Sequence, residues 1–131
     1  MVTGDLMGKK KSCPIDKTLE YIGRKWTLIL VRDLFFGRKK FSEFLEANPQ
    51  LSNKVLSQKL KELEANGLIE KRIISRMPII AEYYLTEKGM ALNKVLYAIA
   101  IFGTTNLKKE IESASCTPGA VAYLKKALNL S

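Results

Sequence analysis

Between residues 53 and 61 the chain carries five polar side chains that the helical repeat places together on one face. This polar face consists of Asn53, Lys54, Ser57, Gln58 and Lys61. The amides of Asn and Gln can make paired hydrogen bonds to adenine, Lys can reach guanine or phosphate, and a Ser hydroxyl suits either. The acids Glu62 and Glu64 come only in the last turn. An ordinary solvated helix face has a similar composition, so the surrounding elements must decide between the two interpretations.

The segment that carries the polar face has clear helix signals at both ends. Ser52 is typical of an N-cap, and its hydroxyl is also placed to meet a phosphate or base; Asn66 and Gly67 predict a left-handed C-cap. The apolar Leu56, Leu60 and Leu63 recur at helical spacing on the opposite face. A short helix over residues 42–47 and a turn at 48–50 precede it, since Pro blocks helix continuation. This order predicts a helix-turn-helix.

A β-hairpin is predicted directly after this helix. Residues 68–74 and 79–85 are rich in Ile and Tyr, and residues 75–78 form the connecting loop. Lys71, Arg72 and Arg76 give the hairpin a basic side that could contact phosphates or the minor groove. Such charges also discourage edge-to-edge aggregation without any ligand. The basic turn at residues 38–40 is a further candidate for backbone contact.

The remaining segments predict a mainly helical protein around a small hairpin. A helix begins at Pro14, and the almost wholly apolar stretch 26–36 suits a helix at the centre of a core. Thr86 caps a long helix over residues 87–112, whose apolar face is wider than a small domain covers by itself. A short last helix begins at residues 117–119. Residues 1–12 are expected to form a flexible, basic tail.

Composition limits the classes of function. The 131 residues include 22 Lys and Arg but 13 Asp and Glu, a formal net charge of +9, which favours a polyanionic partner such as nucleic acid or an anionic membrane. There is no His, and the two Cys lack CxxC spacing, so neither a catalytic site nor a metal or cofactor site is expected. No secretory signal or apolar run of bilayer length is present, and the expected location is the cytoplasm.

Taken together, these segments resemble the HxlR-type winged helix-turn-helix regulators, relatives of the MarR group. The resemblance spans residues 13 to about 103 and is carried by CP at 13–14, GRKW at 23–26, Leu at 30, 34 and 60, FSEF at 41–44, LS at 51–52, VL at 55–56, LEANGLI at 63–69, EY at 82–83 and LTEKG at 85–89. It implies a transcriptional repressor or activator that binds double-stranded operator DNA. It also implies a homodimer in which the N-terminal and long C-terminal helices of two copies pair. One departure concerns the hairpin: Pro78 is followed by Ile79 and Ile80, so any basic contact there must come from Arg76 or Arg72. The segment after Phe102 goes beyond the family minimum and is expected to enlarge the dimer interface.

The resemblance also makes Cys13 a candidate redox sensor, because some family members respond to electrophiles or oxidants through a cysteine just before the first helix. A helix N-terminus and nearby lysines favour the thiolate, whereas Asp16 opposes it. The alternative is a small, inert packing residue.

The sequence therefore predicts an α+β winged helix-turn-helix with a long dimerisation helix. One domain spans residues 13–131, and its C-terminal dimerisation helices cover about residues 87–131. The expected DNA-binding residues are Ser52, Asn53, Lys54, Ser57, Gln58, Lys61, Arg72 and Arg76. The alternative is a winged-helix module that binds another protein without sequence-specific DNA binding. An enzyme is not expected, because no acid, base and nucleophile converge.

Overall fold

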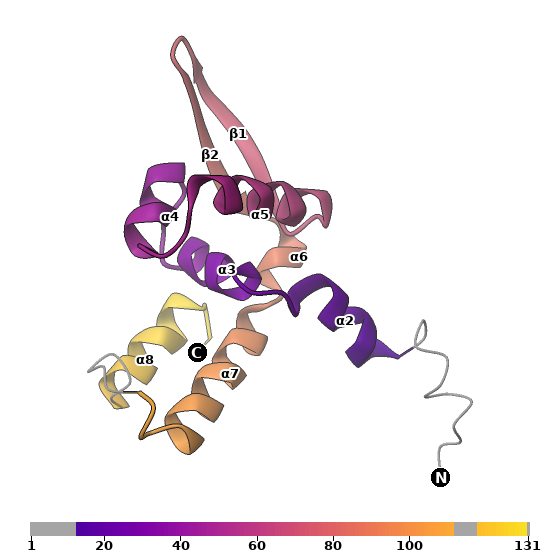
Figure 1. The fold of residues 1–131 in the computed structure, drawn as a ribbon. Helices are drawn as coiled ribbons and strands as arrows, with labels where there is room; N and C mark the ends of the chain where they lie inside the picture. Colours follow the sequence, from indigo (N-terminus) through magenta and orange to yellow (C-terminus); the bar gives the residue numbers. More distant parts are fainter. Residues whose placement is uncertain (1–12, 112–117, 131) are drawn as a thin grey trace.

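The computed structural model describes residues 13–111 and 118–130. The helices and strands follow the order α2 (Pro14–Ile22), α3 (Thr27–Phe35), α4 (Phe41–Ala47), α5 (Asn53–Ala65), β1 (Ile69–Arg76), β2 (Ile79–Leu85), α6 (Glu87–Met90), α7 (Asn93–Asn106) and α8 (Pro118–Ala127) (Figure 1). The expected tail at residues 1–12 lies outside the described residues. The fold is a winged helix-turn-helix with a two-stranded hairpin, which confirms the predicted fold class.

The centre of the core lies where α3, α4 and α5 meet. Leu30, Val31, Phe44 and Leu56 are fully buried there, and the root of the hairpin closes the core through Ile69. The expected apolar helix at 26–36 is confirmed but starts one residue later. Trp26 has a left-handed φ of 80° and therefore precedes the helix rather than beginning it.

Both predicted ends of α5 are confirmed. The Ser52 hydroxyl accepts a hydrogen bond from the Val55 backbone amide at 3.1 Å, which satisfies one amide of the first turn. After the helix, Gly67 adopts a φ of +75°, where a side chain would be strained. The chain then turns directly into β1, so only residues 66–68 separate the helix from the hairpin.

The hairpin, called the wing below, is longer than the sequence analysis predicted. Ser75 pairs with Ile80 and Arg76 pairs with Ile79, which leaves only Met77 and Pro78 in the turn. The predicted loop at residues 75–78 is therefore wrong for its first two residues, because Ile79 and Ile80 supply strand partners for them. An irregularity in the register between Ile73 and Ser75 accommodates the extra pairs.

A single helix over residues 87–112 is also contradicted. The Thr86 hydroxyl does cap a helix by accepting from the Gly89 amide at 3.1 Å, but α6 ends at Met90. The chain turns at Ala91 and Leu92 before α7 begins. Gly89 lies so close to the hairpin root that a Cβ on it would be 2.1 Å from the Leu68 carbonyl oxygen. Tertiary packing therefore fixes α6 against the hairpin, and α7 leaves in another direction (Figure 1).

The last helix, α8, packs back on the same chain. Leu128 just beyond it is fully buried, and its carbonyl accepts a hydrogen bond from the Asn93 side chain at 3.0 Å. Phe36 and Tyr123 bring their ring centroids to 6.0 Å. Part of the apolar surface of this segment thus covers α3 and α7 of the same chain, and its place in a dimer interface stays a prediction. No helix in the described part of the chain combines the length and the hydrophobicity needed to cross a membrane.

Candidate nucleic-acid interface

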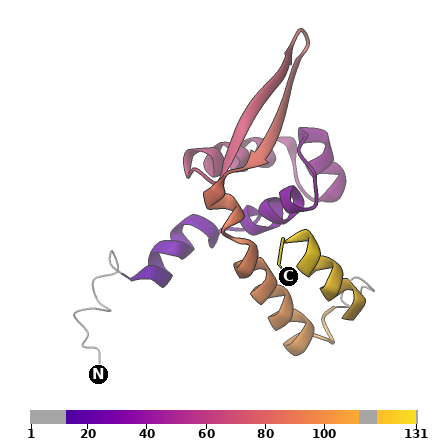
Figure 2. The ribbon, with the colours of Figure 1, turned by 180° about the vertical axis from the view of Figure 1, so that it is seen from behind.

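The structure brings the five predicted residues of the α5 polar face together on the outside of the helix-turn-helix. Asn53, Lys54, Gln58 and Lys61 are exposed and Ser57 is half-buried, whereas the leucines of α5 face the core. The buried leucines of α5 lie in the core that α5 shares with α3, so the polar face lies on the side away from that core. Figures 1 and 2 show α3 along the other side of α5. Ser52 is exposed at the N-terminal end of the same face. The arrangement presents hydroxyl, amide and ammonium groups along two turns of helix.

The charges around α5 make this face cationic at its N-terminal end. Glu62, the nearer of its two acids, forms an ion pair with Lys59 at 3.1 Å. Among the described residues, no carboxylate comes within ion-pair distance of Lys54 or Lys61. Two ammonium groups therefore stay available to an anionic partner.

A buried polar cluster fixes the turn that presents α5, and sequence reasoning missed it. Asp33 on α3 is fully buried, and its carboxylate accepts hydrogen bonds from Asn48 Nδ2 at 2.7 Å and from Arg32 Nη2 at 2.9 Å. Arg38 Nη1 approaches the same carboxylate at 3.6 Å. Asn48, the C-cap of α4, also donates to the Phe44 carbonyl of its own helix at 2.9 Å, and its bond to Asp33 ties the end of α4 to α3. The only signal in the sequence was an acid within an otherwise apolar helix, an arrangement that requires buried partners.

The basic turn at residues 38–40 is mostly engaged inside the chain. Lys39 Nζ lies 3.8 Å from the Glu82 carboxylate, and the Lys39 carbonyl accepts the Tyr83 amide at 2.8 Å. Glu43 accepts the Lys39 and Lys40 backbone amides, both at 2.9 Å. These two hydrogen bonds lower the pKa of the Glu43 carboxyl group. The turn therefore caps α4 and holds the wing, and only Lys40 is fully exposed.

The two predicted arginines of the wing differ in their surroundings. Arg72 forms an ion pair with Glu70, which raises the pKa of its guanidinium, and its Cζ lies 4.0 Å from the centroid of the Tyr84 ring. A hydrogen bond to Glu82 raises the pKa of the Tyr84 phenol. Arg76 is exposed beside the turn of the wing and belongs to no ion pair among the described residues. Arg76 is therefore the freer cation.

Two helices outside the helix-turn-helix expose apolar side chains. On α2 these are Ile15 and Leu19, and on α7 they are Ile99 and Phe102, of which Ile15 is 68% and Phe102 60% exposed. Cys13 lies at the N-cap of α2 and is a free thiol that is only 9% exposed. The structure thus places Cys13 next to the exposed apolar surface of α2 but covers most of the thiol itself.

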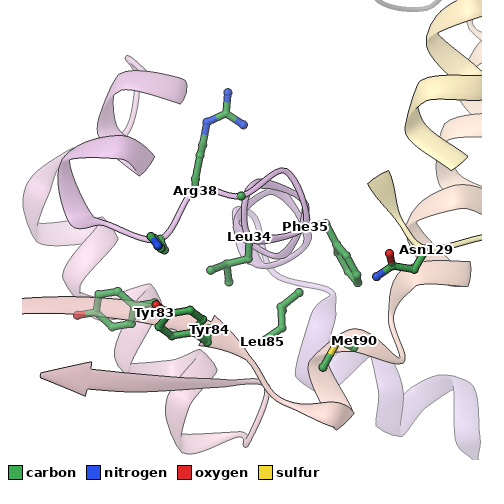
Figure 3. Close-up of a pocket in the computed structure, with 10 residues that line it drawn as sticks. Leu34, Phe35, Arg38, Tyr83, Tyr84, Leu85, Met90 and Asn129 are labelled. Carbon is green, nitrogen blue, oxygen red and sulfur yellow. The ribbon is translucent and has the colours of Figure 1, made fainter. Parts of the chain in front are cut away.

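A cavity of about 370 Å³ lies between the end of α3, the root of the wing and α6 (Figure 3). Leu34, Phe35, Leu85 and Met90 form its apolar wall, and the side chain of Asn129 lies at one end (Figure 3). The cations beside it, Arg38 and Lys39, already pair with Asp33 and Glu82. Within residues 13–111 and 118–130, no group of acids, Cys or His could hold a metal ion.

Comparisons with known proteins agree with this geometry. A family model described as HxlR-like helix-turn-helix matches residues 21–111. The HTH-type transcriptional regulator YvaP of Bacillus subtilis is 37% identical over 99 residues, which cover 75% of this chain and 92% of YvaP.

Solved structures extend the similarity to the fold. The redox regulator HypR in its oxidized form has a TM-score of 0.67 and 35% identity, covering 72% of this chain and 97% of HypR. The reduced form of the transcriptional regulator YodB from B. subtilis has a TM-score of 0.63 and 33% identity, covering 72% and 93% of the two chains. The region matched by the family model contains both the helix-turn-helix segment and the wing.

Proposed function

Because the chain belongs to the HxlR-like helix-turn-helix family and is a transcriptional regulator, we propose that it binds operator DNA sequence-specifically as a homodimer. In this proposal α5 lies in the major groove, and the wing contacts the adjacent backbone or minor groove. The observation that carries it is the exposed α5 polar face, where amides occur with two lysines that pair with no acid of the described residues, and where the helix has no acid until its last turn. A protein-binding face would more often present aromatic anchors.

The residues of α5 and of the wing would make different kinds of contact with DNA. Asn53 and Gln58 specify bases, because amides bond adenine in a paired way, while Ser57 adapts to its neighbours. Ser52, Lys54 and Lys61 contact phosphates or guanine, and Arg76 contacts the backbone beside them. Arg72 contributes less, since Glu70 and Tyr84 already hold its guanidinium.

Replacing Gln58 with Ala should lower affinity for the preferred site by about 1–3 kcal/mol while leaving affinity for unrelated duplexes unchanged. The preferred site is first selected from random duplex DNA, and both affinities are then measured by fluorescence anisotropy over a range of salt. Each phosphate neutralised should add roughly −0.9 to the log–log salt slope. Glu64→Ala, at the exposed C-terminal end of the same helix, is the matched control and should keep the preference. A flat salt response, or equal preferences for the protein and Gln58→Ala, would contradict the assignment.

The homodimer part rests on the exposed apolar side chains of α2 and α7. Pairing of these helices between two copies would remove the apolar side chains from water. Their burial would stabilise the dimer by roughly 25 cal/mol per Å² of apolar surface. It would also place two α5 helices for half-sites that lie about one helical turn of DNA apart, roughly 34–36 Å.

Replacing Phe102 with Lys should convert a sedimenting dimer into a monomer, because a charge would be buried at the proposed interface. Sedimentation velocity over a range of concentrations measures the association state. The matched control is Met77→Lys, which adds the same charge at an exposed apolar residue outside α2 and α7 and should remain dimeric. A concentration-independent monomer for the unaltered protein would remove the model of two half-sites.

A redox response through Cys13 is the third part of the proposal. HypR is described as a redox regulator, and Cys13 lies beside the apolar surface assigned to pairing, so oxidation there would alter the dimer. The same DNA titration is therefore repeated after treatment with a thiol oxidant such as diamide. Cys13→Ser should abolish the change in affinity, while Cys116→Ser should retain it. An oxidant effect that survives Cys13→Ser would overturn this role.

A further inference from the structure

The tip of the wing, residues 77–79, is apolar and highly exposed, although it belongs to a surface expected to meet a polyanion. Met77 is 93% and Ile79 75% exposed, and Pro78 between them is also exposed. The short turn keeps these side chains at the end of the paired strands rather than folding them against the body. Among the residues that the structure describes, therefore, none removes this apolar surface from water, and such patches mark interaction sites more often than isolated exposed residues do.

The position of the wing tip restricts what it can meet. Both views show the wing extending past α5 on the side away from α3 (Figures 1 and 2). The exposed residues of α5 also lie away from the core that its leucines share with α3. α2 and α7, which carry the apolar residues assigned to pairing, lie on the opposite side of the helix-turn-helix (Figure 1). A molecule bound along α5 would therefore extend beside the wing tip.

The charges of the wing favour a nucleic acid over an apolar protein surface as that molecule. Its acids are Glu70 near the root and Glu82 at mid-length, and they pair with Arg72 and Lys39. From residue 71 to residue 81 the sequence contains no acid, and Arg76 directly precedes the apolar tip. A cation beside an apolar tip suits a narrow groove between phosphates, where the cation is attracted and the tip can meet the bases.

We propose that Met77 and Ile79 form an apolar wedge, which enters the minor groove beside the α5 contact site and partly unstacks a base step. This inference rests on the proposed DNA-binding function and assigns the wing a specific action within it. Met, Ile and Pro are among the residue types that proteins insert between base steps, with a resulting kink of roughly 20–90°. In a dimer the two wings would introduce two such kinks in one operator.

The wedge predicts a strong effect on DNA shape and a weak one on affinity. Inserting apolar side chains removes them from water, but unstacking a base step costs a few kcal/mol and offsets much of that gain. The double variant Met77→Ser/Ile79→Ser should therefore lose the bend while its affinity falls about tenfold or less. A wing that contacts only phosphates would show no such change in shape.

The experiment places 2-aminopurine at successive positions flanking the selected half-site and a fluorophore pair at the duplex ends. Binding of the unaltered protein should raise 2-aminopurine fluorescence at one step and shorten the end-to-end distance. Met77→Ser/Ile79→Ser should abolish both signals and keep the salt slope and the thermal melting of the protein. Ile73→Ser, which removes a half-exposed Ile nearer the root of the wing, is the matched control and should retain both.

Three results would overturn the wedge. One is equal unstacking and bending by the unaltered protein and the double variant. A second is loss of the dimer in the double variant by sedimentation, which would make the tip a contact between two copies. A third is binding of the selected duplex with no unstacking at any position, which leaves the DNA-binding function intact and removes the wedge alone. If the unaltered protein binds no duplex in a salt-dependent way, both the proposed DNA-binding function and the proposed wedge are wrong.

Discussion

Replacing Asp33 with Ala should lower the free energy of unfolding by about 2–3 kcal/mol. The substitution removes a fully buried acceptor and leaves Asn48 Nδ2 with only the Phe44 carbonyl. Arg32 and Arg38 lose their carboxylate too, but their side chains are more than one-third exposed, so water replaces part of that interaction. The cluster also holds the turn before α5, and operator affinity should therefore fall with stability.

Chemical denaturation with two spectroscopic probes measures the stability change, and anisotropy measures DNA affinity. Asp33→Asn should lower the free energy of unfolding less than Asp33→Ala does, because its amide oxygen can still accept a hydrogen bond from Asn48. The matched control is Asp16→Ala on α2, an acid in no ion pair among the described residues, which should stay within about 0.5 kcal/mol of the unaltered protein. An Asp33→Ala variant as stable as that control would show that the cluster does not hold the turn.

Replacing Gly89 with Ala should destabilise the protein by about 3 kcal/mol or more, because the new Cβ would be 2.1 Å from the Leu68 carbonyl oxygen. That atom belongs to the backbone, and the same carbonyl accepts the Thr86 amide at 3.1 Å. Relief of the clash must therefore move α6 away from the root of the wing. The DNA bend introduced by the wing should weaken as well.

Gly103→Ala tests whether the destabilisation expected for Gly89→Ala comes from crowding or would follow the replacement of any glycine. A Cβ on Gly103 would lie 3.6 Å from Ile111 Cδ1, an ordinary contact, and Ala favours the helical backbone of α7 by roughly 0.5–1 kcal/mol. Thermal melting should therefore move in opposite directions for the two variants, with sedimentation confirming an unchanged association state. Destabilisation of equal size in both would refute the crowding argument.

Local signals predicted most of the fold because they act within a few residues. Ser52 and Gly67 fixed the ends of α5, and the leucines at helical spacing identified its buried face. The order of the helices and hairpin then identified the fold class and the family. The α5 polar face exists as a surface, whereas its contacts with DNA remain a prediction.

The features that sequence reasoning missed depend on contacts between distant segments. Met90, Ala91 and Leu92 favour a helix locally, so these residue types do not predict the end of α6 at Met90. The close packing of Gly89 on Leu68 produces that end. The pairing of Asp33 with Asn48 joins residues on different elements. The exposure of Ile79 depends on how far the wing projects beyond the body, which periodicity does not report.

A rotation at the turn formed by Ala91 and Leu92 would be amplified along the length of α7. α7 has 14 residues, and at about 1.5 Å per residue it is roughly 21 Å long. A rotation of roughly 10° at this pivot would move the far end of a helix of that length by about 3.6 Å, roughly one base-pair rise. The contacts of α8 with both α3 and α7 oppose such a rotation, so in two copies joined along α7 they would help to hold the separation of the α5 helices. A change of one base pair in the spacing also rotates one half-site by roughly 34–36° about the DNA axis, so operators with altered spacing should be bound more weakly.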